Sequence, residues 1–270
     1  MSANPIAVLI YEIIQDIRAR SNDRRPALIG VAGAQGCGKS YLCQLLEAAN
    51  RGRFAHFSLD DVYLRKLERD AKARQMHPLL ATRGAPGTHD LELARRVIEA
   101  LNSAQDRAET RLPRFDKRAD DRAPDGDWPV FRGKPEAILF DGWCVGALPD
   151  ELGPAPVNRL EADQDGDGRW RTLVGGELAT TYQAFFDRFD AIVYLQAPDW
   201  EIVRSWRGQQ EEQTLGRKLS ALEEARLDGF LMFYERITKS MMAGRHRATH
   251  LVKLGKLREP LKLEIEGNPH

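Results

Sequence analysis

The residues best suited to chemistry form a glycine-rich segment at positions 33 to 40, which reads Gly-Ala-Gln-Gly-Cys-Gly-Lys-Ser. This is a complete G-x-x-x-x-G-K-[ST] phosphate-binding pattern. Its glycines allow the backbone to wrap a polyphosphate, so that successive N–H groups point at the phosphate oxygens. We expect Lys39 to reach the β- and γ-phosphates and Ser40 to hold Mg²⁺. The predicted nucleotide-binding residues are Gly33, Ala34, Gln35, Gly36, Cys37, Gly38, Lys39, Ser40 and Tyr41.

A carboxylate at the end of an apolar run is the second chemical feature. Asp141 closes the apolar residues 137–140, and nucleotide-binding proteins with this loop place an acid there to hold Mg²⁺, usually through water. The Asp-Gly pair that it begins is also a common turn. With the phosphate loop present we favour the metal role, and we predict Ser40 and Asp141 as the Mg²⁺ ligands.

Two further acids, Asp60 and Asp61, end the apolar residues 54–59. Phosphoryl transfer to a hydroxyl needs a carboxylate that orients the acceptor and takes its proton. One of the pair is suited to that task while the other caps the next helix, although either residue could be a helix cap alone.

Two segments combine rigid turns with arginines and acids, at residues 83–90 and 112–122. Arginine binds carboxylate or phosphate groups in a forked geometry. The alternative is that both are solvated charged loops. Arg204 and Arg207 lie three positions apart in a helical pattern and can face the same way. Residues 199–215 are therefore a candidate lid over the nucleotide, or else a surface helix with ordinary charges.

The acidic segment 161–168 imitates the start of a calcium-binding loop. The pattern begins at Asp163, and its twelfth position is Val174, where such a loop requires a glutamate. We interpret the segment as a polar surface loop without calcium, and the sequence assigns it no further role.

Apolar runs and helical patterns alternate along the chain, which predicts an α/β fold with a parallel sheet of the P-loop NTPase type and helices on both faces. The expected strands are residues 27–32, 54–59, 137–140, 191–195 and 250–254. Ligands of such sheets collect at the carboxyl ends of the strands, where the loop, Asp60 and Asp141 all fall. We predict one domain over residues 1–270, with an N-terminal helix within 1–25 and acceptor-site loops at 70–90 and 112–135.

Composition limits the remaining classes of function. The 270 residues contain 40 basic and 40 acidic side chains, so no net charge favours nucleic acid or a membrane surface. The three cysteines have no zinc-binding spacing. No segment resembles a signal peptide or is apolar over a bilayer's width. We expect a cytoplasmic protein, and the sequence leaves its oligomeric state open.

Taken together, these motifs resemble those of the D-glycerate 3-kinase family, P-loop kinases related to uridine kinase, phosphoribulokinase and bacterial pantothenate kinase. Beside the phosphate loop, the resemblance rests on Ser58-Leu-Asp-Asp-Val-Tyr-Leu64, Arg83-Gly-Ala-Pro-Gly-Thr-His-Asp90, Leu112-Pro-Arg-Phe-Asp-Lys117 and Ile138-Leu-Phe-Asp-Gly-Trp143. The block at 83–90 is the most specific, because general P-loop proteins lack it.

The resemblance implies transfer of the ATP γ-phosphoryl group to the 3-hydroxyl of D-glycerate, with ATP and Mg²⁺ as cofactors. It implies Lys39, Asp60 and Asp141 as catalytic residues, with Asp60 as the base. Related kinases often have Glu at the position of Asp141 and Tyr at that of Phe115, which lacks the phenol. Arg204 and Arg207 are expected at the nucleotide. The candidate acceptor residues are Asp61, Tyr63, Arg83, His89, Asp90, Arg114, Asp116, Lys117 and Arg122.

Two alternatives remain at this stage. The acceptor could be another small hydroxyl compound such as pantothenate, a nucleoside or a sugar. The protein could also bind ATP as a regulator without phosphorylating a metabolite.

Overall fold

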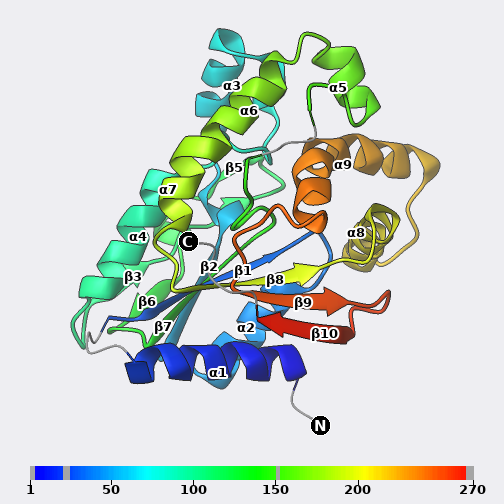
Figure 1. The fold of residues 1–270 in the computed structure, drawn as a ribbon. Coiled ribbons are helices and arrows are strands. Elements are labelled where there is room, and N and C mark those ends of the chain that lie inside the picture. The colour runs from blue at the N-terminus through cyan, green and yellow to red at the C-terminus, as the bar shows by residue number, and fades with distance from the viewer. Residues whose placement is uncertain (1–3, 21–24, 150–152, 266–270) are drawn as a thin grey trace.

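The structure is a computed structural model that describes residues 4–20, 25–149 and 153–265. Its centre is a six-stranded sheet in the order β10-β9-β8-β1-β7-β2 (Figure 1). Five strands run parallel, which confirms the prediction. The last strand pairs antiparallel with its neighbour and was not predicted. The strands are β1 (Ala27–Gly33), β2 (Phe54–Ser58), β7 (Ala137–Gly142), β8 (Ala191–Gln196), β9 (His250–Leu254) and β10 (Pro260–Ile265).

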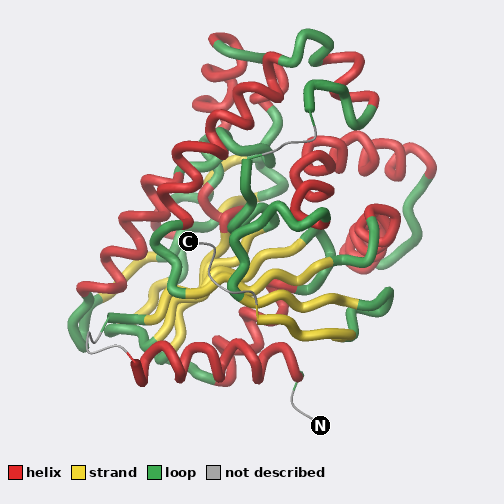
Figure 2. The backbone as a smooth tube through the Cα atoms, viewed as in Figure 1, coloured by secondary structure: helices red, strands yellow, loops and turns green. Residues whose placement is uncertain are grey.

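Helices cover both faces of this sheet, as predicted (Figures 1 and 2). On one face a buried core joins the sheet to α1 (Pro5–Arg20), α2 (Lys39–Ala49) and α8 (Trp200–Leu215). On the other face the core includes α4 (Leu91–Ser103), α6 (Arg169–Glu177), the π-helical turn η4 (Leu178–Tyr182), α7 (Gln183–Phe186) and α9 (Ala221–Met242). None of the helices in the described part of the chain has the length and apolar character needed to span a bilayer.

The predicted N-terminal helix within residues 1–25 corresponds to α1, while residues 1–3 and 21–24 of that range lie outside the described residues. Its isoleucines recur at helical spacing, and Ile10 and Ile14 are completely buried. This apolar stripe fixes the helix against the sheet.

Three strand ends meet at one edge of the sheet, and this edge positions the candidate site. β1 runs into the phosphate loop and α2. β2 runs into the 3₁₀ turn η1 (Leu59–Val62), which contains Asp60 and Asp61. Asp141 of β7 stands level with Val31 of β1 and Ser58 of β2. The parallel register therefore brings the loop and the acids together, as the sequence predicts.

Two segments predicted as loops contain regular structure, which corrects the prediction. Residues 70–90 include the end of α3 (Lys66–Gln75) and the 3₁₀ turn η2 (Pro78–Ala81). The apolar pattern missed α3 because its one buried side chain is an arginine, Arg69. Residues 112–135 fold into short elements: β4 (Phe115–Asp116), β5 (Asp121–Arg122), η3 (Asp125–Asp127) and β6 (Val130–Arg132), the last paired with β3 (Glu109–Arg111).

The acidic segment 161–168 is not the polar surface loop that the sequence suggested. Glu161, at the start of α5 (Arg159–Gln164), is completely buried. It accepts hydrogen bonds from Arg236 of α9 at 2.9 and 2.7 Å. Asp165 is equally buried and accepts the N–H groups of Trp170 and Arg171 at the start of α6. These acids therefore join α5 and α6 to α9.

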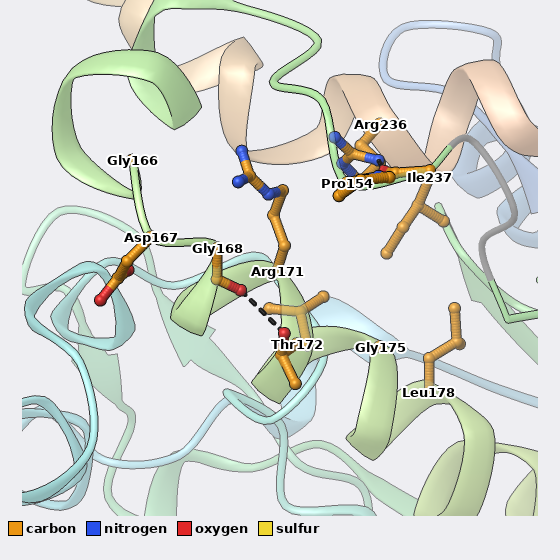
Figure 3. Close-up of a pocket in the computed structure, with 12 residues that line it drawn as sticks. Pro154, Gly166, Asp167, Gly168, Arg171, Thr172, Gly175, Leu178, Arg236 and Ile237 are labelled. Atoms are coloured by element: carbon orange, nitrogen blue, oxygen red, sulfur yellow. Dashed lines mark hydrogen bonds between the residues drawn. The ribbon is translucent and has the colours of Figure 1, made fainter.

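A cavity of about 440 Å³ lies beside this ion-pair cluster (Figure 3). Arg171 and Arg236 line it, and both pair with Glu161. Leu178 and Ile237 form an apolar part of its wall. No residue of its lining belongs to the phosphate loop or to the predicted acceptor set. We therefore infer that Arg171 and Arg236 hold the surrounding helices together through their ion pairs with Glu161.

Replacing Glu161 with glutamine is expected to lower the free energy of unfolding by about 3 kcal/mol, because removing one partner leaves a buried charge uncompensated. Arg236 also donates to the carbonyl oxygens of Gly153 and Ala155, which do not replace the negative charge of Glu161. Urea unfolding followed by circular dichroism measures the change. Glu212→Gln is the control, because Glu212 pairs with Lys218 at the surface and its loss should not alter unfolding measurably. Equal losses in the two variants would contradict the assignment.

Candidate active site

The phosphate loop has the backbone geometry that its sequence pattern requires. Gly36 and Gly38 have φ angles of 77° and 98°, in the left-handed region that favours glycine. α2 begins at Lys39, so the positive end of this helix follows the loop directly. This arrangement fits the binding of a polyphosphate.

Two elements border the loop: α8, which the sequence suggested as a candidate lid, and the turn between β9 and β10, which it did not connect to the site. A Cβ atom at Gly36 would lie 2.8 Å from the backbone of Trp206 in α8. From the turn between β9 and β10, Arg258 Nε donates to the Gly36 carbonyl oxygen at 2.6 Å, and its guanidinium lies 5.0 Å from the Trp206 ring centre. Sequence analysis missed Arg258 because no motif surrounds it.

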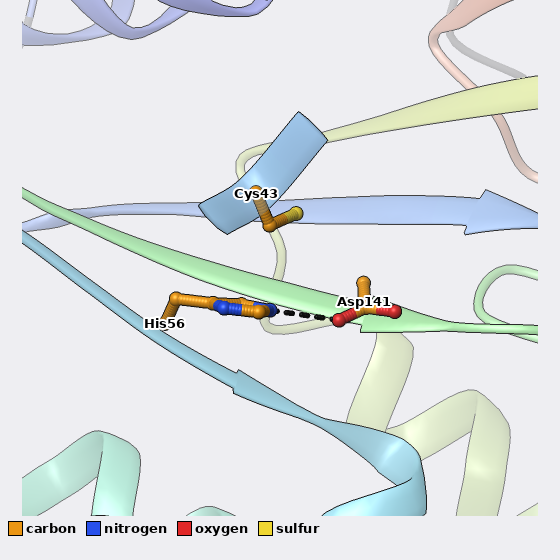
Figure 4. A group of neighbouring side chains, drawn as sticks. All are labelled: Cys43, His56 and Asp141. Atoms are coloured by element: carbon orange, nitrogen blue, oxygen red, sulfur yellow. Dashed lines mark hydrogen bonds and ion pairs between the residues drawn. The ribbon is translucent and has the colours of Figure 1, made fainter. Parts of the chain in front are cut away.

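Asp141 is completely buried and has two hydrogen-bond partners, Ser40 and His56, of which Figure 4 shows His56. Ser40 Oγ of the phosphate loop donates to one carboxylate oxygen at 2.7 Å. His56 Nε2 of β2 lies 2.8 Å from the other oxygen. An ionised carboxylate only accepts, so His56 carries its proton on Nε2. His56 was not predicted, because it lies inside a strand and the contact spans 85 positions.

The residues at this position suit magnesium. Ser40 and Asp141 offer the oxygen ligands that Mg²⁺ prefers. Cys43 is near both His56 and Asp141, but burial raises the pKa of its thiol well above the usual range. A protonated thiol is a poor ligand for a softer metal, and His56 Nε2 is engaged as a donor. Ser40 and Asp141 would therefore hold the ion, and His56 would hold the Asp141 carboxylate in place.

Replacing His56 with leucine is expected to weaken divalent-metal binding about 10- to 100-fold, as is usual when a partner of a metal ligand is lost. Without its hydrogen bond, the Asp141 carboxylate can rotate away from Ser40. Titration of Mn²⁺ by electron paramagnetic resonance, with ATP present, measures the affinity directly. His56→Gln keeps an N–H donor and should recover part of the loss. Unchanged Mn²⁺ binding in the leucine variant would remove His56 from this role.

Asp60 is oriented by two side chains and by a capped turn. The Tyr63 hydroxyl donates to one carboxylate oxygen and Lys117 Nζ donates to the other, both at 2.8 Å. Ser58 caps the turn by accepting the Asp60 N–H. Burial by itself would raise the pKa of Asp60, but the charges of Lys117 and Lys39 and the Tyr63 bond hold it below its usual range. Asp60 is therefore ionised at neutral pH.

Replacing Lys117 with methionine is expected to move the acid limb of the kcat/KM profile to higher pH. A base must be ionised to act, so activity falls as pH drops through its pKa. Lys117 lowers the pKa of Asp60, and without it burial raises that pKa. The measurement is kcat/KM for the acceptor at about ten pH values between about 4.5 and 8. Lys134→Met, which changes an exposed lysine before the start of β7 at the other end of that strand from Asp141, should leave the limb in place, and a shift in both variants would contradict this coupling.

Asp61 has a mainly structural environment. Its carboxylate accepts the Ser58 N–H at 3.0 Å and completes a capping box around η1. Arg114 donates to the same oxygen at 3.0 Å. Burial raises the pKa of Asp61, although Arg114 opposes this. Of the two acids, Asp60 is thus the one whose carboxylate is oriented by Tyr63 and Lys117, side chains of the candidate acceptor site.

His89 is held between two tyrosines and keeps one polar atom unused. Its ring stacks on Tyr63 at 4.5 Å, and Nδ1 lies 2.6 Å from the Tyr182 hydroxyl. That hydroxyl also accepts the Gly87 N–H. Burial lowers the pKa of His89 to about 3, so the ring is neutral at physiological pH. Nε2 is buried and has no hydrogen-bond partner among the described residues.

Arg83 packs against the rings of Phe115 and Phe230, and Phe115 in turn contacts Tyr63. It pairs with Asp120 and its guanidinium lies 5.6 Å from the Phe115 ring centre and 5.7 Å from that of Phe230. Phe115 also contacts Tyr63 edge to face at 5.1 Å. Arg83, Tyr63 and His89 are thus linked through one cluster, as their prediction as acceptor residues requires.

For three other predicted acceptor residues, contacts within the protein account for the residue type without a ligand. Asp90 caps α4 by accepting the Leu93 N–H at 2.8 Å. Arg122 donates to Asp90 at 3.1 Å and to the Tyr63 carbonyl oxygen at 2.9 Å. Asp116 accepts two N–H groups in the turn after β4. Their role toward a substrate stays a prediction.

The two candidate lid arginines differ in their contacts. Arg204 is bound to Asp228 of α9 through two nitrogens. Arg207 pairs with Glu211 in its own helix, and its backbone N would lie 3.0 Å from a Cβ at Gly36. Arg207 is thus adjacent to the phosphate loop, whereas Arg204 ties α8 to α9. Their contact with nucleotide stays a prediction.

The parallel sheet, the phosphate loop and the acids at the strand ends define a P-loop kinase fold. A solved structure of D-glycerate 3-kinase from Cryptococcus neoformans has this fold, with a TM-score of 0.74 at 22% identity over 97% of this chain and 98% of that one. No protein-family model matches the chain.

Sequence relatives define the family. The chain is 30% identical over 245 residues to the uncharacterized kinase mug58 of Schizosaccharomyces pombe, covering 85% of this chain and 86% of that protein. It is 33% identical over 203 residues to the chloroplastic D-glycerate 3-kinase of Arabidopsis thaliana, covering 70% of this chain but 42% of that protein. The chain therefore belongs to the glycerate kinase-like family of P-loop kinases. It is a P-loop small-molecule kinase.

Proposed function

We propose that the protein transfers the γ-phosphoryl group of ATP to the 3-hydroxyl of D-glycerate, giving 3-phosphoglycerate and ADP. The observation that carries the proposal is the ionised Asp60, held by Tyr63 and Lys117 within the electrostatic influence of Lys39. A carboxylate in this state is suited to accept a hydroxyl proton beside a bound polyphosphate. The relative from Arabidopsis, a D-glycerate 3-kinase, supports this acceptor.

In the proposed reaction the 3-hydroxyl oxygen of D-glycerate attacks the γ-phosphorus, while its proton passes to Asp60. The bond between the γ-phosphorus and the bridging oxygen breaks, and ADP leaves with that electron pair. Lys39 and the loop amides neutralise the charge on the phosphates. Mg²⁺ bound at Ser40 and Asp141 would neutralise further phosphate charge. Asp60 then returns its proton to solvent.

Recognition of the acceptor is assigned to the cluster around Tyr63. Nε2 of His89 is buried and has no hydrogen-bond partner among the described residues, so it is suited to a hydrogen bond with a hydroxyl group of a small hydroxy acid. Arg83 and Arg114 already bind carboxylates of the protein, Asp120 and Asp61. A substrate carboxylate could take the place of one of these partners in the same forked geometry.

The test is a turnover assay with MgATP and a panel of acceptors: D-glycerate, L-glycerate, pantothenate, uridine and ribose. We expect ADP release with D-glycerate, and 3-phosphoglycerate identified by ³¹P nuclear magnetic resonance. Faster turnover of another acceptor would overturn the glycerate assignment while keeping the kinase. Tight ATP binding without turnover of any acceptor would favour a regulatory ATP-binding protein.

A further inference from the structure

The strand β10 carries an apolar face that a single chain leaves uncovered. From Lys262 to Ile265 its residues alternate, with Leu263 and Ile265 on one face and Lys262 and Glu264 on the other, whereas Leu261 lies in a bulge between Pro260 and Lys262. Such alternation is typical of a strand with one covered face. The three apolar residues are nevertheless 66%, 52% and 83% exposed.

This exposed face continues the buried core of the sheet. Leu263 pairs with Val252 of β9, and paired residues project to the same side of a sheet. Val252 is completely buried in the core that contains α1 and α2. β10 is also the edge strand (Figure 1), with β9 as its one sheet neighbour among the described residues. The regularly paired part of this edge, residues 262–265, is a template for pairing with another strand.

We propose that β10 pairs antiparallel with β10 of a second copy of this chain, which joins two six-stranded sheets into one. A two-fold axis at Leu263 places Leu263 opposite itself. The same register places Lys262 opposite Glu264 twice. The two Leu263 side chains then lie beside each other on one face of the joined sheet, and each charge meets its opposite.

The self-complementary register is the reason for choosing a second copy as the occupant. Opposite charges directly across a strand pair stabilise it, and like charges destabilise it. In one copy Glu264 already lies 2.6 Å from Lys262 and 3.1 Å from Lys253, so the strand has an ordered charged face to present. An isologous contact of this kind closes after two copies and does not propagate into a fibre.

The oligomeric state of the full chain in solution tests the proposal. Sedimentation velocity is measured from about 1 to 100 µM, the range in which moderate dimers dissociate. We expect the wild type to form a dimer, and Leu263→Lys to raise the dissociation constant at least about tenfold, because it puts two lysines on the axis. Leu257→Lys is the matched control: Leu257 is 87% exposed in the preceding turn, outside the stripe, and its replacement should leave the dimer intact. A wild type that stays monomeric throughout, or a dimer unaffected by Leu263→Lys, would overturn the proposal.

A cross-linking measurement checks the register independently of the stability of the lysine variant. Cys37, Cys43 and Cys144 are buried, so a cysteine placed at 263 is the exposed thiol of the described residues. Leu263→Cys with a short bis-maleimide should give a covalent dimer in high yield, whereas Leu257→Cys should give little. Equal yields would mean that some other surface brings the copies together, or that part of the same chain covers β10.

Discussion

Replacing Asp60 with asparagine should lower kcat about 1,000-fold, while the dissociation constant for ATP changes by less than about threefold. Asparagine has nearly the same shape and can accept the Tyr63 hydrogen bond, but it cannot take a proton from the acceptor. The phosphate loop has no hydrogen bond to Asp60 among the described contacts. The effect should therefore appear in turnover and not in nucleotide binding.

Steady-state kinetics with the best acceptor of the panel and calorimetric titration with a non-hydrolysable ATP analogue separate these two quantities. Asp116→Asn is the matched control, because Asp116 lies in the same region but accepts two backbone N–H groups of a turn. It should keep kcat within about threefold. A near-normal kcat for the Asp60 variant would contradict the assignment of Asp60 as the base.

The sequence predicted the parts of the site whose residues are neighbours in the chain. The phosphate loop is eight consecutive residues, and its glycines leave few backbone alternatives. Asp60 and Asp141 were found because each follows an apolar run, and the ends of parallel strands share one edge. The alternation of strands and helices gave the fold class for the same local reason.

The missed residues reach the site through long-range contacts that no spacing records. His56 meets Asp141 because two strands lie in register, and Arg258 meets Gly36 across 222 positions. Tyr234 of α9 packs so closely on Gly84 that a Cβ there would lie 2.5 Å from its hydroxyl. Arg122, which the family resemblance suggested as an acceptor residue, binds Asp90, which caps a helix, and its contact with the acceptor stays a prediction.

β10 was not predicted for the same reason, because it depends on a contact with another strand. Its apolar and polar residues alternate over a short stretch that follows a turn, and a strand of this kind depends on pairing with β9 rather than on its own propensity. The turn before it delivers Arg258 to the phosphate loop. The C-terminal hairpin is thus part of the nucleotide site as well as the edge of the sheet.

Replacing Gly36 with alanine should lower the free energy of unfolding by about 4 kcal/mol. The left-handed φ of 77° costs an alanine about 1–2 kcal/mol. The added Cβ would also lie 2.8 Å from the Trp206 backbone, and overpacking of this kind costs about 1–3 kcal/mol. Either the loop or α8 must move, and the Arg258 hydrogen bond to the Gly36 carbonyl oxygen would move with it.

Gly38→Ala separates the two causes, because Gly38 has a similar φ of 98° but nothing within 4 Å of its Cβ position. Without nucleotide, it should lose only the backbone part, about 1–2 kcal/mol. Urea unfolding of both variants in the absence of ATP gives the comparison, and the thermal stabilisation by added MgATP then reports how far the displaced loop has lost its affinity. If the two glycines prove equally costly in the free protein, α8 does not press on the phosphate loop, and Arg207 loses its reason to be placed beside the nucleotide.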